Sequence, residues 1–365
     1  MKKQLTLAVS DFERFRKPTR REKFLAEMSA VVPWKELAAE VEPYYPRATS
    51  AGGRPAVGLD RMLRIHCLQL WFNLSDPAVE EALYDSLAMR SFVGIDLGRE
   101  PVPDETTVMR FRHLLETHKL GERIFEEVGR VLLKRGLRLS KGTIVDATII
   151  AAPSSTKNAE GERDPEMHQV KKGNERHFGM KAHVGVDSQS KVIHSVVVTP
   201  ANTADCKVMA QLLHGQETRV YGDQAYKSQG HVIRAKAPKA KDFTNRQCRW
   251  KHHIDEAIKA RNRTKSRIRS RVEHSIGVIK RVFGFQKVRY RGLAKNGNRL
   301  FVTAALANIF LVRYAVLGAV RPQEGIGTRK SPSLDKTALK SDRIAMNHLI
   351  LLSVSRRTLG CADVP

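Results

Sequence analysis

This 365-residue chain has no paired cysteines, no long apolar run and no excess of acidic residues. Its four cysteines are scattered, at positions 67, 206, 248 and 361, without a C-x-x-C pair. That spacing argues against a structural zinc site and a disulfide framework, and it is compatible with a reducing cytosol. The sequence also has no G-x-x-x-x-G-K-[ST] segment, so we expect no use of ATP. No set of serine, histidine and aspartate, or of cysteine and histidine, stands in a context typical of covalent catalysis.

Membrane segments are not expected either. The longest apolar run, residues 300–312 (LFVTAALANIFLV), is 13 residues long. A membrane-spanning helix needs about 20, so the run predicts a buried core helix. At the amino terminus a short apolar stretch is interrupted by Asp11 and Glu13, too early for a signal peptide. We therefore expect a soluble, cytoplasmic protein.

What the sequence does have is positive charge. Lysine and arginine exceed aspartate and glutamate by 64 − 38 = 26, and the sequence pI is near 10.2. An excess of this size favours a polyanionic partner, because neutralised phosphates release their counterions. Anionic membrane and ribosomal RNA are alternatives, but DNA is the partner we expect, with the protein associated with the nucleoid. Residues 225–295 contain 21 basic and 4 acidic residues, so this block is the predicted DNA footprint.

Changes in composition and in apolar periodicity along the chain predict four segments. Residues 1–57 are mixed, 58–138 are helical, 139–316 form an α/β domain, and 317–365 are rich in Pro, Gly, Ser and Lys and are predicted to be unfolded. In the helical segment, Asp76 and Asp104 are candidate N-caps. Arg110 and Arg112 are expected to project from the helix that follows Asp104. Short helices joined by tight turns resemble a DNA-binding helix-turn-helix, and an ordinary helical bundle is the alternative.

From Thr143 the apolar period changes from about 3.6 to 2, as in strands. Strands are predicted at 143–150, 181–187, 191–199 and 218–223, with a helix at 204–214 before the last of them. The order is β-β-β-α-β, in a mixed α/β sheet. The polar insert at 153–177 is predicted to be a surface loop. Asn202 and Asp205 are expected to cap the helix predicted at 204–214. A supporting role near a metal is the alternative.

Three carboxylates occupy unusual positions. Asp146 lies in the middle of an otherwise apolar strand, Asp223 directly follows the last strand, and Glu273 lies in a basic helix predicted from about residue 254 into the 280s. Each has an ordinary alternative: Asp146 as the partner of a buried cation, Asp223 as an N-cap, Glu273 as an i,i+4 partner of Arg269. A β-β-β-α-β sheet can nevertheless bring all three to one edge.

Such a cluster is suited to divalent cations. Paired ions held by carboxylates stabilise both the attacking and the leaving oxygen of an in-line phosphoryl displacement, and Mg²⁺ favours oxygen ligands. At about 100° per residue, Arg269, Glu273 and Lys280 share one helix face, so both cations would lie where phosphate oxygens bind. Further basic residues on this helix are candidate DNA contacts: Arg267, Arg271 and Arg281.

Several long segments resemble bacterial insertion-sequence transposases of the DDE type, in the insertion-sequence four/five superfamily and most closely family five. They are PVPDETTVMRFRHLLE, the stretch from IVDATII to KAHVGVD, HSVVVTPANTADC, VYGDQAY and SRIRSRVEHSIGVIKR. The resemblance covers roughly residues 20–316. It implies a ribonuclease H-like fold with Asp146, Asp223 and Glu273 as catalytic metal ligands. It also implies two Mg²⁺ ions per site, with Mn²⁺ as a substitute.

The family's last motif, Y-x2-R-x3-E-x6-K, is matched by Arg269, Glu273 and Lys280, but Ser266 stands in place of the tyrosine. We therefore predict a transposase that binds terminal inverted repeats, cleaves DNA by metal-dependent hydrolysis and transfers the 3′ end to target DNA. Because two ends must be joined, a homodimer or a larger synaptic complex is expected. A ribonuclease H-like nuclease without strand transfer and a catalytically inactive DNA-binding regulator are the alternatives.

Overall fold

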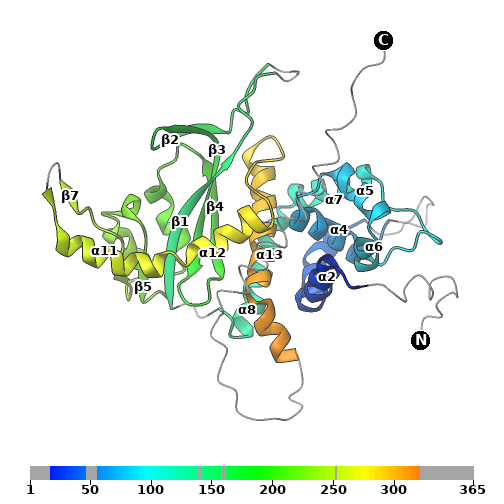
Figure 1. The fold of residues 1–365 in the computed structure, drawn as a ribbon, viewed down its shortest axis with the longest axis horizontal. Coiled ribbons are helices and arrows are strands. Elements are labelled where there is room, and N and C mark those ends of the chain that lie inside the picture. Colours follow the sequence, from blue (N-terminus) through cyan, green and yellow to red (C-terminus); the bar gives the residue numbers. More distant parts are fainter. Residues whose placement is uncertain are drawn as a thin grey trace.

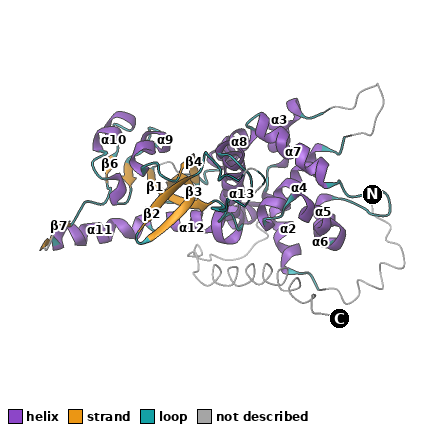
Figure 2. Cartoon of the chain, turned by 90° about the horizontal axis from the view of Figure 1, so that it is seen from above, coloured by secondary structure: helices purple, strands orange, loops and turns teal. Residues whose placement is uncertain are grey.

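The computed structural model describes residues 17–46, 56–138, 141–157, 159, 161–250 and 253–320. In the segment 317–365, predicted to be unfolded, residues 317–320 instead form the end of a helix, and the remainder, from residue 321, lies outside the described residues. So do residues 1–16 and the turn-rich stretch 47–55. Within the described part, a group of helices lies beside a sheet, and one long helix runs between them (Figures 1 and 2).

The helical part is larger than its predicted core at 58–138, because residues 20–44 also fold as helices. Its elements are α2 (Arg20–Val31), α3 (Trp34–Val41), η1 (Glu42–Tyr44), α4 (Leu59–Phe72), α5 (Asp76–Asp85), α6 (Leu87–Val93), α7 (Glu105–Thr117) and α8 (Leu120–Lys134). They pack as a bundle around shared apolar side chains such as Leu25, Leu68 and Leu115, all at most 2% exposed.

Side-chain caps define several of these helix starts. Thr19 and Glu22 form a reciprocal capping box at α2, and Asp104 accepts from the Thr107 amide at 2.7 Å, as predicted. At α5 the cap is Ser75, which accepts from Ala78 N at 3.2 Å. The prediction that Asp76 is this cap is therefore wrong by one residue. Asp76 occupies the first turn instead, where its carboxylate pairs with Arg112.

The sheet has six strands: β1 (Gly142–Ala151), β2 (His168–Lys172), β3 (Glu175–Asp187), β4 (Ile193–Pro200), β5 (Arg219–Tyr221) and β6 (Lys241–Asp242). The long β3 pairs antiparallel with β1, β2 and β4, whereas β5 pairs parallel with β1 and with β6. This is the mixed sheet predicted from the sequence, and it has the arrangement of a ribonuclease H-like fold.

Two strands and one connection differ from prediction. The insert at 153–177 is not only a loop, because β2 pairs with the first half of β3 to make a ribbon that projects beyond the sheet (Figure 1). β6 adds a second parallel strand. It is only two residues long, so it leaves no alternating pattern in the sequence. The helix expected at 204–214 is two short pieces, η2 (Asp205–Val208) and α9 (Met209–Leu212).

The basic helix predicted from about 254 into the 280s is also interrupted. α11 (Glu256–Arg269) ends before α12 (Val272–Gly277), and a π-helical turn, η4 (Val278–Val282), follows. Tertiary bonds explain the break: Arg271 donates to Ser188 O and Ser275 to Lys191 O, both at 2.6 Å. These bonds tie the segment to the β3–β4 turn, so residues 269–280 do not lie on one continuous helix.

The helix α13 (Leu293–Val320) contains the predicted core run and joins both parts of the fold. Asn308 bonds both backbone groups of Ile193 in β4 at 2.7 Å, while Arg313 pairs with Glu27 of α2. Length and composition would let this one helix, among the described residues, cross a membrane. However, 72% of its most apolar window is buried inside the protein, as expected for a core helix.

Candidate active site

The first two predicted carboxylates follow the same rung of a parallel strand pair. In the β1–β5 register Ile144 is opposite Tyr221, and Asp146 and Asp223 each come two residues later. Neighbouring strands lie about 4.8 Å apart, so this register sets the two carboxylates side by side where β1 and β5 diverge. Asp223 also accepts from Ala225 N at 2.9 Å, which turns the chain and fixes the carboxylate at the strand end.

The electrostatics of Asp146 reflect this placement. Its side chain is 18% exposed. The pKa of Asp146 is raised to about 6, mainly by burial and also by the nearby charges of Asp223 and Asp205, against the lowering effects of the Ala147 amide and Arg269. The site therefore concentrates negative charge in a partly dehydrated position. That combination favours binding of a cation.

Two cations from the basic segment reach the same strand. Arg269, at the end of α11, places Nη1 3.3 Å from Asp146 Oδ2. Lys280, in the π-helical turn, donates to Thr148 Oγ1 at 3.2 Å and to Ile149 O at 2.8 Å. Thus Arg269 and Lys280 both face β1, although the break after Arg269 means that they do so from different helical turns.

Glu273 is placed differently. It lies in α12, which packs on β1, but the residue is exposed, and its charge acts on the neighbouring imidazole of His274. Among the residues the structure describes, no group of three or more histidine, cysteine, aspartate or glutamate side chains is arranged to hold a metal. The structure thus pairs Asp146 with Asp223, and the part played by Glu273 as third ligand stays a prediction.

The donor set at this strand end suits a hard divalent cation. Two carboxylates lie together, and Mg²⁺ characteristically takes one or two protein carboxylates and fills its remaining positions with water and phosphate. The residues present therefore fit the implied metal.

Sequence reasoning undervalued one more acidic residue. Asp205, expected to cap a helix, has no capping hydrogen bond there. Its Oδ1 instead accepts from Lys181 Nζ at 2.8 Å, and its charge acts on both Asp146 and Tyr226. The available signal was the placement of Asp205 six residues after the end of the third predicted strand, on the next segment to return to the sheet.

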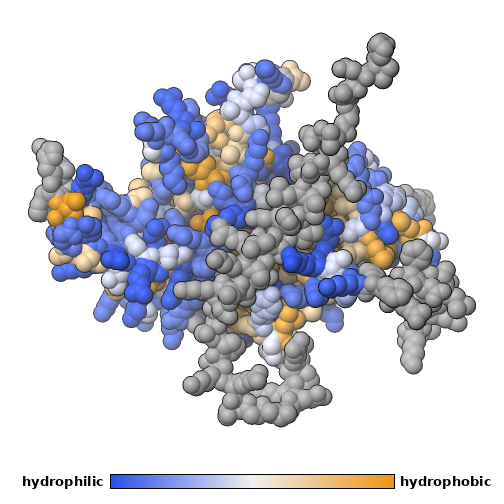
Figure 3. All heavy atoms as spheres, viewed as in Figure 1, coloured by the Kyte–Doolittle hydropathy of each residue, from blue (hydrophilic) through white to orange (hydrophobic). Residues whose placement is uncertain are grey.

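The candidate DNA contacts divide into exposed and buried groups. Arg267, Arg281 and Arg110 are exposed. Arg271 is largely exposed too, although one of its nitrogens is bound to Ser188 O. Figure 3 shows hydrophilic side chains covering the visible surface around α11. The expectation that Arg112 projects from its helix is wrong.

Arg112 is only 7% exposed because it serves the helical core. It pairs with Asp76 at 3.1 Å and Glu116 at 2.8 Å, and its guanidinium lies 4.1 Å from the Tyr290 ring centroid. These contacts fasten α7 to α5 and to the segment before α13. We therefore remove Arg112 from the DNA-contact set.

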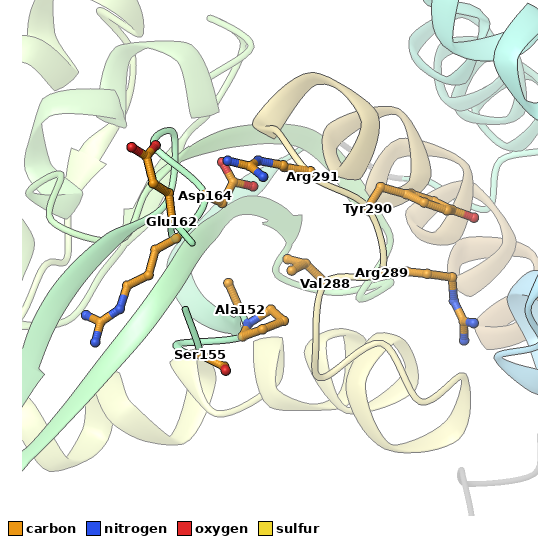
Figure 4. A pocket seen from close by; sticks show the side chains of 10 residues that line it. Ala152, Ser155, Glu162, Asp164, Val288, Arg289, Tyr290 and Arg291 are labelled. Atoms are coloured by element: carbon orange, nitrogen blue, oxygen red, sulfur yellow. The ribbon is translucent and has the colours of Figure 1, made fainter. Parts of the chain in front are cut away.

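A separate pocket of about 220 Å³ lies where the insert after β1 meets the segment before α13 (Figure 4). Its walls include Ser155, Asp164, Val288 and Tyr290. Asp164 accepts from Gly292 N at 2.7 Å, so this carboxylate already has a structural role at the approach to α13. None of the three predicted catalytic carboxylates lines the pocket.

Comparison with known families agrees with the geometry. Residues 138–309 match the family model described as a transposase DDE domain, and residues 13–114 match one described as a transposase domain. Together, the mixed sheet and these matches indicate a nuclease or transferase enzyme of the DDE class. The chain belongs to the insertion-sequence DDE transposases. No solved structure gives a significant match to it.

Proposed function

We propose that this transposase binds the terminal inverted repeats of its element, cleaves a strand at each end and joins the exposed 3′ end to target DNA. The observation that carries the proposal is the shared register of Asp146 and Asp223 in a chain whose two matched families are both transposase domains. The spacing of Arg269, Glu273 and Lys280 supports placing it near insertion-sequence family five.

In this proposal, Asp146 and Asp223 hold divalent cations between them and Glu273 completes the site. When bound, two Mg²⁺ ions, or Mn²⁺ in their place, would lower the pKa of water and stabilise developing charge on phosphate oxygens. The chain's own part is to position phosphate and attacking group. Arg269 and Lys280 face the strand that carries Asp146, where each can bind a non-bridging phosphate oxygen.

Two displacements follow in order. Water attacks the phosphodiester at the element end, and the bond from phosphorus to the O3′ of the element's terminal nucleotide breaks. The element then carries a 3′ hydroxyl, and the 5′ phosphate stays on the flanking DNA. That hydroxyl then attacks a target phosphodiester, so a new P–O bond forms as an old one breaks and no external energy source is required. Joining two ends requires two active sites, and we propose a dimer or larger synaptic assembly.

Exposed arginines would hold the duplex beside this site. Arg267, Arg271 and Arg281 lie on or beside α11 and α12, and Arg110 lies on the helical part. We place the protein in the cytoplasm at the nucleoid, where both DNA substrates are found.

The test uses a supercoiled donor plasmid that carries the gene's own flanking DNA, a target plasmid and Mg²⁺. Joined donor–target products that disappear with Asp146→Asn would support the proposal. Cleaved donor without joined products would identify a nuclease that does not transfer strands. Retained DNA binding with neither product, in the presence of Mg²⁺ or Mn²⁺, would identify a DNA-binding regulator.

A further inference from the structure

Tyr226 is a buried phenol at the carboxylate pair. It lies three residues after Asp223, its side chain is fully buried, and its hydroxyl has no hydrogen-bond partner among the described residues. The ring has little room to move, because a Cβ added at Gly222 would lie 3.2 Å from Tyr226 Cδ2 and 3.1 Å from Val145 Cγ2. A buried polar group without a partner costs free energy, so the hydroxyl needs an explanation.

The charges that act most strongly on this hydroxyl belong to acidic residues. Burial raises the pKa of Tyr226, and the charges of Asp205, Asp146 and Asp223 raise it further. The phenol is therefore protonated at neutral pH and can donate its proton to an acceptor. Every charged neighbour named here is an acceptor, and each is also at the candidate active site.

Asp205, whose charge acts on Tyr226 more strongly than those of Asp146 and Asp223, is held by an ion pair. Lys181 Nζ donates to Asp205 Oδ1 at 2.8 Å and to Thr203 O at 2.7 Å. Both Lys181 and Asp205 are mostly buried, at 12% and 22% side-chain exposure, so this ion pair is less screened than a surface pair. The pair fixes the start of η2 against β3.

His183 is a further buried polar side chain close to Asp205. The Thr199 hydroxyl donates to Pro200 O, so the 2.8 Å contact between Thr199 Oγ1 and His183 Nε2 is one in which the imidazole donates. Nδ1 is then the unprotonated nitrogen. It lies 3.8 Å from Asp205 Oδ1, is buried and has no partner within the described ranges. Two fully buried side chains, Tyr226 and His183, thus present unpartnered polar atoms toward one cluster.

We propose that Tyr226 is a positioning residue of the active site, whose hydroxyl donates to the carboxylates or water molecules that surround a divalent cation held by Asp146 and Asp223, with Asp205 fixed by Lys181. This inference rests on the proposed function. The inference extends the proposed function to residues that contact the metal ligands rather than the metal. Such residues commonly tune metal affinity by orienting the ligands.

The decisive variant is Tyr226→Phe, which removes only the hydroxyl and leaves the ring packed. Mn²⁺ binding to the full chain without DNA, followed by electron paramagnetic resonance, should weaken about tenfold or more. The melting temperature in EDTA should stay the same or rise, because the lost hydroxyl has no protein partner. Asp205→Asn should also weaken Mn²⁺ binding. Tyr290→Phe, at another mostly buried tyrosine beside Arg112, is the matched control and should bind Mn²⁺ normally.

Asp146→Asn in the same titration separates the two proposals. If Asp146→Asn loses Mn²⁺ while Tyr226→Phe binds it as the unaltered protein does, the role of Tyr226 is refuted and the proposed function stands. If Tyr226→Phe lowers the melting temperature in EDTA without changing Mn²⁺ affinity, the hydroxyl is structural and the inference also fails. Normal Mn²⁺ binding by Asp146→Asn itself would instead overturn the assignment of the metal site.

Discussion

Arg269 Nη1 lies 3.3 Å from Asp146 Oδ2, and this contact joins the end of α11 to the central strand of the sheet across 123 positions of sequence. The same guanidinium has a buried Nε without a partner in the described part of the chain. Arg269 therefore has one nitrogen bound to the carboxylate and another enclosed without an acceptor, so its contact with Asp146 is the charged pair that fixes this side chain.

The first prediction concerns this ion pair. Burial is the main reason that the pKa of Asp146 is about 6, and Arg269 holds it below the value that burial and the neighbouring aspartates would otherwise set. Arg269→Ala should therefore raise the midpoint of Asp146 ionisation above about 6. Carboxyl ¹³C NMR of the protein in EDTA measures it directly. Arg267→Ala, an exposed neighbour on the same helix, is the control, and an equal shift in both variants would contradict a specific role for Arg269.

A second prediction separates surface arginines from buried ones. Arg267→Ala should weaken DNA binding evenly across sequences and reduce the slope of log K against log salt by about 1, because one phosphate contact is lost. Arg112→Ala should leave that slope unchanged but destabilise the fold by about 3 kcal/mol, because Asp76 and Glu116 lose a buried partner. Fluorescence anisotropy over a salt series and urea unfolding measure the two effects. A reduced salt slope for Arg112→Ala would mean that Arg112 does contact DNA.

A third prediction concerns the stability of the helical bundle in acid. The pKa of His66 is lowered from 6.5 to about 4, mainly by burial and also by the positive charges of Arg299 and Arg112. Below pH 6.5 the unfolded chain therefore binds a proton at His66, whereas the folded chain binds this proton only near pH 4. Stability contributed by neutral His66 is present above 6.5 and is lost as the pH falls through this window, by up to about 3 kcal/mol.

His66→Phe tests this directly, because the new ring keeps the aromatic contact with Phe111 and cannot titrate. Other buried histidines, such as His183, also contribute to acid sensitivity, so the quantity to compare is the slope of unfolding free energy against pH in each protein. The variant should show a shallower slope between pH 6.5 and 4. Identical slopes would mean that His66 is protonated in the folded state.

A fourth prediction concerns the contact between α8 and α13. Gly121 N donates to Asn298 Oδ1 at 2.8 Å, and a Cβ at residue 121 would lie 2.5 Å from both oxygens of Asn298. Gly121→Ala should thus force the helices apart and cost about 1–3 kcal/mol. Gly58→Ala, where nothing lies within 4 Å of the new Cβ, should change stability by less than about 1 kcal/mol. Thermal unfolding of the two variants measures the difference, and equal melting temperatures would contradict this packing.

The sequence by itself determined much about this protein. Alternating apolar residues predicted β1, β3, β4 and β5, because side chains on a strand alternate between two faces whatever surrounds them. The run at 300–312 predicted a core helix in the same way, since its length and composition are local properties. The long matching segments also sufficed to predict the transposase family, which the comparisons confirm.

Tertiary structure decided the rest. The basic segment has helical composition throughout, yet bonds from Arg271 and Ser275 to the β3–β4 turn break it, and those partners lie more than 80 positions away in sequence. Arg112 and Arg110 look alike in sequence, but only the packing of α5 and α7 buries Arg112. Tyr226 and Asp205 approach the carboxylate pair because the sheet brings distant segments together. Sequence periodicity reports which face of an element is apolar, whereas such contacts depend on which elements meet.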